Sequence, residues 1–337
     1  MHAVDREVIS QILAWLRSGS RCWLATVAAT WGSSPRPVGS LLGCNGDGVL
    51  VGSLSGGCVE DDLQEKLLNG ELAADHAQLF RYGVTTEETE KFGLPCGGHL
   101  DIVIEPQKVN NQTIDQFEQL YQALHERRWM LRTVDLNSDA VALTSASEPA
   151  PLNWSADTQL LKHTYGPSYH LFIIGAGMVS HYLADMAKML DYQVTVCDPR
   201  EDLLEQFPVD GVTKVCDMPD DAVRAFADDY ATAIVAMTHD PRIDDMGLME
   251  ALNTRAFYVG AMGSSRTSAS RRERLLTLGL SAQALSRLHA PIGLPIGSKT
   301  PPEIAIAVLA EITAKRKTEN SETSALVNAD GKNPALA

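Results

Sequence analysis

The chain has 337 residues, of which 45% are hydrophobic and 21% charged; this composition excludes a disordered or fibrous chain, and the length favours two domains. The net charge of -15 at pH 7 argues against binding to nucleic acid or to an anionic membrane surface. The six cysteines form no CxxC pair, no stretch of about 20 apolar residues indicates a membrane span, and the N-terminus lacks the basic start of a signal peptide. We therefore expect a cytoplasmic protein with reduced thiols.

The first part of the chain predicts a mixed α+β domain over residues 1–155. Apolar residues at helical spacing predict a helix over residues 4–18, and "CWLATVAAT" predicts the strand that follows. A hairpin is expected around "CNGDG", and a helix from about Cys58 to Leu68. "AQLFRYGV" and "LDIVIEP" indicate two more strands, followed by a helix over residues 112–127 and a strand over 129–136. After Asn137 the pattern loosens into polar residues and Pro, with one weak strand at 158–162, so we place the domain boundary late in that segment.

The second part predicts a Rossmann-like domain over residues 166–316. Buried strands such as "YHLFIIGAG", "YQVTVCDPR" and "ATAIVAMT" alternate with helical segments. This alternation is typical of right-handed crossovers and of a doubly wound parallel sheet with helices on both faces. The fold class is therefore α/β, with a mixed first domain and a Rossmann-like second one. Residues 317–337 are polar and without period, and we expect them to be a disordered tail.

The segment "IIGAGMVS" has the pattern of a dinucleotide-binding loop. Gly175 and Gly177 follow a predicted strand and open a helix, and Ser180 stands where the fingerprint has its third small residue. A helix start suits a pyrophosphate, and Asp198, at the end of the next strand, is placed to hold a ribose hydroxyl. Arg200 is able to accept a phosphate, so both NAD and NADP stay open as ligands. In the competing interpretation the glycines serve only a tight turn.

Two cysteines lie in glycine-containing loops: Cys58 follows Gly56 and Gly57, and Cys96 precedes Gly97 and Gly98. Cys58 begins a predicted helix, whose amide dipoles favour a thiolate, and glycines let a bulky group approach the main chain. Such a thiol is able to act as a nucleophile or to face a soft metal centre. The competing interpretation is that both are small buried core residues. A zinc site formed by Cys96 and His99 lacks further close ligands.

Six segments in this order resemble the XdhC/CoxI family, the accessory proteins of molybdenum hydroxylases such as xanthine dehydrogenase. They are "ATWGSSPRPVGS", "GSLSGGCVE", "PCGGHLDI", "IIGAGMVSHYLADMAKMLDYQVTVCDPR", "YVGAMGSSRT" and "HAPIGLPIGSKTPPEIAIAVLAEI". The resemblance covers most of residues 5–315. It implies a chaperone rather than an enzyme: a protein that binds the molybdenum cofactor, keeps it while a cysteine desulfurase supports its sulfuration, and inserts it into the apo-hydroxylase.

The resemblance also implies where the ligands bind. Carried over by position, it makes the Cys58 and Cys96 loops the cofactor and sulfur-handling site, and Gly175, Gly177 and Asp198 the nucleotide pocket. Met178 departs from the family, whose members commonly have a histidine after GAG; if that histidine contacts the ligand, the second pocket is altered or idle in this chain. A homodimer that brings the two sites of different chains together is a hypothesis.

The cargo is anionic, because its pterin bears a phosphate or, in the cytosine dinucleotide form, a pyrophosphate. An acidic protein needs local cations to bind such a group. Arg36 and Arg266 lie in segments that carry the resemblance, and we prefer this pair among the nearby basic residues.

Two other classes of function stay open. A Rossmann domain together with a reactive cysteine is compatible with an NAD(P)-dependent oxidoreductase, although the two features lie in separate domains. A redox-sensing or ligand-sensing interaction module without cargo is the third interpretation.

Overall fold

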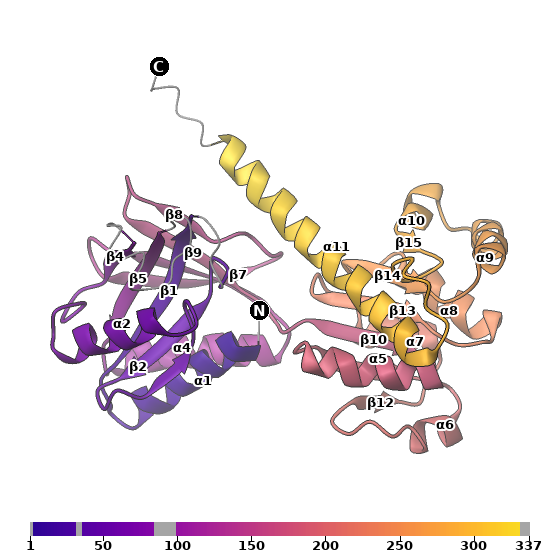
Figure 1. Cartoon of the computed structure of the whole chain (residues 1–337), viewed down its shortest axis with the longest axis horizontal. Coiled ribbons are helices and arrows are strands. Elements are labelled where there is room, and N and C mark those ends of the chain that lie inside the picture. The colour runs from indigo at the N-terminus through magenta and orange to yellow at the C-terminus, as the bar shows by residue number, and fades with distance from the viewer. Residues whose placement is uncertain (1–2, 32–35, 84–98, 331–337) are drawn as a thin grey trace. The chain divides into compact units, whose positions relative to one another are not determined.

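The computed structural model describes residues 3–31, 36–83 and 99–330, with side chains as far as Arg316 in the last helix. The chain divides into two compact units, Met1–Pro167 and Ser168–Ala337 (Figure 1). We expected the first domain to end at residue 155 and the second to begin at 166. The division falls later because strand β9 (Leu160–Tyr165) pairs with β6 (Trp129–Asp135) and so belongs to the first unit.

The first unit is built around a five-stranded sheet in the order β3-β2-β1-β5-β4. The strands are β1 (Cys22–Thr30), β2 (Leu41–Asn45), β3 (Leu50–Gly52), β4 (Gln78–Tyr82) and β5 (Leu100–Gln107). All neighbouring pairs are antiparallel, and β2 and β3 form the predicted hairpin. Side chains alternate along β1: Trp23 and Ala25 face one side of the sheet, and Cys22 and Leu24 face the other.

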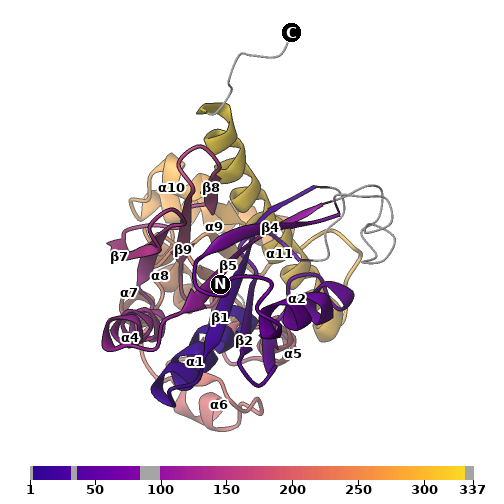
Figure 2. The same cartoon turned by 90° about the vertical axis from the view of Figure 1, so that its left-hand side faces the viewer.

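Different helices cover the two faces of this sheet. α2 (Cys58–Leu68) packs on one face through Val59, Leu63 and Leu67. α1 (Ala3–Arg17) and α4 (Asn111–His125) pack against the other face. Figure 2 turns this unit toward the viewer and shows α1 and α2 on different sides of β1 and β2. These helices confirm the predictions of helices over residues 4–18, 58–68 and 112–127, with ends that differ by at most two residues.

A second sheet, in the order β7-β6-β9-β8, packs on the same side as α1 and α4, where its Val134 and Leu161 contact Val103. Of its strands only β6 was predicted with its bounds, and the weak strand expected at 158–162 is β9. β7 (Ala140–Ala146) and β8 (Asn153–Ser155) lie in the segment that we took for a loosely ordered boundary. None of the residues of β7 is fully buried: its inward-facing Val141 and Leu143 are only partly buried against the core, so the apolar signal of this strand in the sequence is weak.

The second unit confirms the predicted Rossmann-like fold. Six parallel strands lie in the order β12-β11-β10-β13-β14-β15, which in chain order is 3-2-1-4-5-6. They are β10 (His170–Ile174), β11 (Gln193–Cys197), β12 (Thr213–Val215), β13 (Thr232–Ala236), β14 (Tyr258–Ala261) and β15 (Leu288–His289). Since the order reverses beside β10, the carboxyl ends of β10 and β13 flank the edge where such sheets bind ligands.

Helices cover both faces of this parallel sheet. α5 (Met178–Met189) and α11 (Pro301–Asp330) pack on one face (Figure 1). On the other face are α7 (Pro219–Phe226), α8 (Pro241–Ala251) and α9 (Ser265–Thr277). Two short helices, α6 (Glu201–Glu205) and α10 (Ala282–Ser286), complete the unit.

The last helix, α11, continues to Asp330, past residue 317, where we expect the tail to begin. Side chains after Arg316 and all of residues 331–337 lie outside the described part. The segment contains neither Pro nor Gly before Gly331. No helix in residues 3–31, 36–83 and 99–330 is both long enough and apolar enough to cross a membrane.

Candidate functional site

Three segments that carry the family resemblance meet the five-stranded sheet at one end. Thr30 at the end of β1 pairs with Leu100 at the start of β5, and Tyr82 at the end of β4 pairs with the same residue. β3 runs parallel to β1 and ends at Gly52, on the same side. Trp31, Gly83 and His99, the described residues at the borders of two of these segments, therefore adjoin this end, and the segment 53–57 follows β3 on the same side. The segment between Gly83 and His99 contains Cys96, Gly97 and Gly98, which lie outside the described residues.

Cys58 is the first residue of α2, and its side chain is exposed. We expected the loop before Cys58 to present open backbone amides to a ligand. Instead, the loop encloses the carboxylate of Glu60, in the first turn of the same helix. The Oε1 atom accepts from the backbone N–H groups of Leu54 (2.8 Å), Ser55 (2.8 Å) and Gly56 (2.9 Å), and Oε2 from that of Gly57 (2.8 Å). The hydroxyl groups of Ser53 (2.9 Å) and Ser55 (2.7 Å) also donate to this carboxylate.

Two opposing effects set the pKa of Glu60, whose side chain is buried. Burial raises the pKa, but the hydrogen bonds from Gly56, Ser55 and Gly57 outweigh it together and lower the pKa of Glu60 to about 2. The loop is therefore built around an internal anion at neutral pH. A phosphate group of a ligand cannot use these N–H groups while Glu60 holds them. Gly56 has a φ of +101°, which explains the glycine without reference to a ligand.

The start of α2 is tied to the end of β4. The hydroxyl of Tyr82 donates to Asp62 at 3.0 Å, and Lys66 also pairs with Asp62. Asp62 lies four residues after Cys58, so both side chains lie along the same face of the helix. Cys58 is thereby placed on the side of α2 that meets β4, close to where the segment containing Cys96 leaves the sheet.

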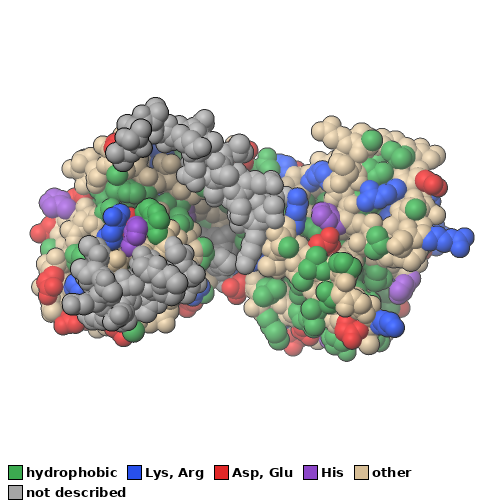
Figure 3. Space-filling model, turned by 45° about the horizontal axis from the view of Figure 1, so that its top comes forward, with side chains coloured by type: hydrophobic (Ala, Val, Ile, Leu, Met, Phe, Trp, Pro, Cys, Tyr) green, Lys and Arg blue, Asp and Glu red, His purple; other side chains and the backbone are tan. Residues whose placement is uncertain are grey.

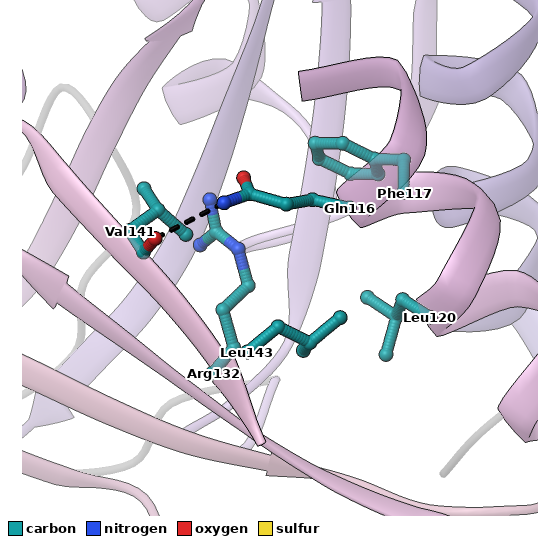
Figure 4. A pocket seen from close by; sticks show the side chains of 6 residues that line it. All are labelled: Gln116, Phe117, Leu120, Arg132, Val141 and Leu143. Atoms are coloured by element: carbon teal, nitrogen blue, oxygen red, sulfur yellow. Dashed lines mark hydrogen bonds between the residues drawn. The ribbon is translucent and has the colours of Figure 1, made fainter. Parts of the chain in front are cut away.

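The pocket between α4, β6 and β7 is too small for a cofactor (Figure 4). Its volume is about 10 Å³, close to the lower limit for one water molecule. Arg132 borders it, but both ends of its guanidinium are bonded to the buried carboxylate of Glu105, at 2.8 and 2.7 Å. The lining residues are Gln116, Phe117, Leu120, Arg132, Val141 and Leu143.

Arg36, the preferred cation of this unit, is half-buried in the turn before β2.

In the second unit, the two glycines at the start of α5 have different structural reasons. Gly175 has a φ of +105°, and a Cβ there would lie 2.5 Å from the Cγ2 atom of Thr238. Gly177, the N-cap of α5, has a φ of -90°, and a Cβ there would meet nothing within 4 Å. No side chain caps the helix. The turn explains Gly175, whereas Gly177 leaves open space at an uncapped helix start, where an anionic ligand fits.

Asp198 lies at the end of β11, where the sequence predicts it, but its carboxylate is fully engaged. Oδ1 accepts from the backbone N–H of Arg200 at 3.0 Å and from its Nε at 2.8 Å. Oδ2 accepts from the N–H of Ala176 at 2.9 Å and from Nη2 of Arg200 at 2.8 Å. Although burial opposes it, these partners lower the pKa of Asp198, whose side chain is 0% exposed. A ribose diol would have to displace Arg200, so the residues present do not fit that part of NAD.

Three arginines on α9 are candidate cations near the sheet: Arg266, Arg271 and Arg272. Of these three, Arg266 is exposed. It is the second residue of α9, which begins just beyond the carboxyl end of β14, and it is exposed with no ion pair to the described residues. Arg271 is buried instead and pairs with Asp244 at 2.7 Å and with Asp245 at 3.2 Å. Arg272 donates to two backbone carbonyl oxygens. Both are structural residues.

Sequence reasoning missed Glu60 and the stacking of His99 on Trp31. The signal for Glu60 was its place at the third position of a helix, where a carboxylate reaches back to amides before the helix. His99, weighed as a zinc ligand, stacks on Trp31 with ring centroids 3.8 Å apart. In the described ranges no group of three or more His, Cys, Asp or Glu side chains is arranged to hold a metal ion.

Comparisons with known proteins agree with this architecture in both units. The XdhC and CoxI family model matches residues 15–83, and the XdhC Rossmann domain model matches residues 171–312. The "Molybdenum cofactor insertion chaperone PaoD" of Escherichia coli (strain K12) is 24% identical over 92% of this chain and 88% of its own length. A protein of Bacillus subtilis (strain 168) described as a probable xanthine dehydrogenase subunit is 25% identical over 90% of this chain and 96% of its own length.

The fold is also that of a known structure. A crystal structure described as a xanthine dehydrogenase from Bacillus halodurans superimposes with a TM-score of 0.71 and 23% identity, over 92% of this chain and 96% of that one. Both domains of the family are thus present here, in the order that the six sequence segments predict. The chain belongs to the XdhC and CoxI family.

Proposed function

We propose that this protein is an accessory chaperone that binds the molybdenum cofactor, supports its sulfuration and inserts it into a hydroxylase of the xanthine dehydrogenase type. The observation that carries the proposal is similarity over nearly the whole chain. A relative that is named as a molybdenum cofactor insertion chaperone aligns with 92% of this protein. The expected partners are an apo-hydroxylase and a cysteine desulfurase in the cytoplasm, and the expected assembly is a homodimer.

The exposed thiol of Cys58 is the group that we assign to the metal end of the cargo. Molybdenum in this cofactor is bound by sulfur, and a cysteine side chain at the surface is a soft neighbour for it. Cys96 is the second thiol of the proposed site. Glu60 keeps the glycine loop rigid next to Cys58, since six hydrogen bonds hold the loop to one carboxylate.

The second unit carries a separate candidate site for an anion. The uncapped start of α5 at Gly177 suits a phosphate or a pyrophosphate, such as that of a cytosine dinucleotide. Arg266, in the same unit, is exposed and available to add a charge-assisted hydrogen bond.

Cofactor retention by the full-length protein tests the proposal. Purified protein is incubated with molybdenum cofactor and separated by gel filtration, and molybdenum and pterin are measured per chain. We expect both with the wild type, and less molybdenum with Cys58→Ser and with Cys96→Ser. Cys216→Ser is the matched control, because Cys216 is also exposed but lies in the Rossmann-like unit. A wild type that retains neither molybdenum nor pterin would contradict the proposal.

An NAD(P)-dependent oxidoreductase with a reactive cysteine is the competing function. The exposed Cys58 and the Rossmann-like fold favour it, whereas the engagement of Asp198 by Arg200 speaks against an ordinary ribose site. The two functions are distinguished by incubating the protein with NAD(P) and a panel of aldehydes and following the absorbance of reduced nicotinamide at roughly 340 nm. We expect no steady turnover.

A further inference from the structure

An exposed aromatic stack lies at the motif-bearing end of the five-stranded sheet. Trp31 follows β1, His99 precedes β5, and the N–H of Trp31 donates to the carbonyl oxygen of His99 at 3.0 Å. The two rings are stacked at 3.8 Å with planes 23° apart. Nevertheless, 48% of Trp31 is exposed. The two residues come from different segments of the family resemblance, "ATWGSSPRPVGS" and "PCGGHLDI", and the cysteine chemistry uses neither.

A basic side chain is held beside this stack. Nε and Nη2 of Arg81, on β4, donate to the two carboxylate oxygens of Asp101 at 2.5 and 2.7 Å. The guanidinium carbon lies 5.7 Å from the centroid of the Trp31 ring. Asp101 is 3% exposed but Arg81 is 48% exposed, so a buried carboxylate orients a cation that reaches the surface. Nη1 of Arg81 has no hydrogen bond to the described residues.

Core packing does not account for this cluster. Asp101 on β5, and His99 just before the strand, alternate with Leu100 and Ile102, which face α2. The cluster therefore lies on the other face of the sheet from Cys58, beyond the part where Val103 packs against the second sheet. Figure 3 shows that, on this unit, a basic side chain, a histidine and hydrophobic side chains adjoin one another at the surface.

We propose that Trp31, His99 and Arg81 bind a flat, polar heterocycle, namely the pterin ring of the cargo. A ring of this kind stacks on the exposed part of an indole, as nucleobases do on aromatic side chains. Nη1 of Arg81, which Asp101 does not engage, donates to the carbonyl oxygen of the ring, and Asp101 fixes the orientation of the guanidinium. The identity of the ligand rests on the proposed function. Because the dithiolene that binds molybdenum is fused to the pterin, a cargo whose ring lies on Trp31 reaches Cys58 only around the end of the sheet.

Titration of the full-length protein with pterin-6-carboxylate, a fluorescent pterin, tests this site directly. We expect quenching on binding, a dissociation constant about tenfold higher for Trp31→Ala, and a smaller increase for Trp31→Phe, which keeps a ring. Arg81→Gln should weaken binding severalfold. The control is Val49→Ala, since Val49 is 51% exposed in the turn between β2 and β3, at the other end of the sheet. Cys58→Ser should bind the pterin like the wild type.

The same variants are then tested for retention of molybdenum cofactor. If wild type and Trp31→Ala bind the pterin equally, the assignment is wrong, whether or not the chaperone function stands. If pterin binding depends on Trp31 but the wild type retains no molybdenum cofactor, the site stands and the proposed function fails. Should Trp31→Ala fail to fold by circular dichroism, Trp31→Phe decides, and unchanged affinity together with an unaffected Arg81→Gln variant then overturns the site.

Discussion

The two helices α2 and α5 both begin after a glycine-containing loop, but the loops leave very different room for an anion. Before α2, four backbone N–H groups and two hydroxyl groups point at the carboxylate of Glu60. Before α5, Asp198 takes only the N–H of Ala176, and the N-cap Gly177 has neither a capping side chain nor an atom near the position of a Cβ. The loop before α2 therefore holds an internal anion, whereas the start of α5 leaves its first N–H groups without an internal one.

The difference teaches that the backbone donors at the two helix starts are used in different ways. The α2 loop directs its N–H groups to the carboxylate of Glu60 and leaves the side chain of Cys58 exposed. The first N–H groups of α5 have no capping side chain. Each half of this comparison is tested by removing the group that defines it.

The largest effect is expected from Glu60→Gln. The amide cannot accept the same donors, and its NH₂ group faces N–H groups, so we expect the free energy of unfolding of the first unit to fall by about 3 kcal/mol or more. Urea unfolding followed by circular dichroism measures the loss. Glu65→Gln, at an exposed position of the same helix, is the control and should change stability by less than about 0.5 kcal/mol. Equal stability of the two variants would show that the loop does not depend on Glu60.

Gly175→Ala should have the next largest effect, in the second unit. A methyl group there would lie 2.5 Å from Thr238, and the backbone would keep a left-handed φ of +105°. Strain of this kind costs about 2–3 kcal/mol, so the melting temperature of this unit should fall by several degrees. An unchanged melting temperature would mean that the turn is not constrained as described.

The fold could be predicted where the burial of a strand produces a clear hydrophobic pattern in the sequence. β10 and β13 are buried along their whole length, and their unbroken apolar runs identify parallel strands. β7 has no fully buried residue, and the alternation of its partly buried Val141 and Leu143 with exposed residues is short and gives only a weak signal. The second sheet of the first unit was therefore missed for a physical reason.

The candidate site could be predicted only where its contacts join residues that are close together in the sequence. The exposure of Cys58 at the start of a helix follows from the local sequence. The capture of the loop by Glu60 is also local, and its position in the first turn was a usable signal. By contrast, the stack of Trp31 on His99 depends on the pairing of β1 with β5, which joins residues far apart in the chain. No local pattern contains that contact.

Low pH should reduce the difference in unfolding free energy between the wild type and Glu60→Gln. The folded state holds the pKa of Glu60 near 2, below the ordinary value of 4.5, so the carboxylate contributes stability above pH 4.5 and loses it as the pH falls toward 2. We expect the difference in unfolding free energy between the two proteins to be largest at neutral pH and smaller at about pH 3. Urea unfolding at both pH values measures it. A difference that is the same at both would mean that the variant acts by another route than loss of the charge.

The smallest effect on stability, and the sharpest test of the comparison, is expected from Gly177→Ala. Its φ of -90° suits any residue and its Cβ would enter empty space, so stability should change by less than about 0.5 kcal/mol. The same methyl group would stand where a phosphate approaches α5, so we expect CTP, used as a pyrophosphate-bearing probe in calorimetry, to bind about tenfold more weakly. Arg266→Gln should weaken it further by a few fold. If CTP affinity falls instead in Gly56→Ala and not in Gly177→Ala, then the α2 loop binds the external anion after all, and Glu60 must be a group that the ligand displaces.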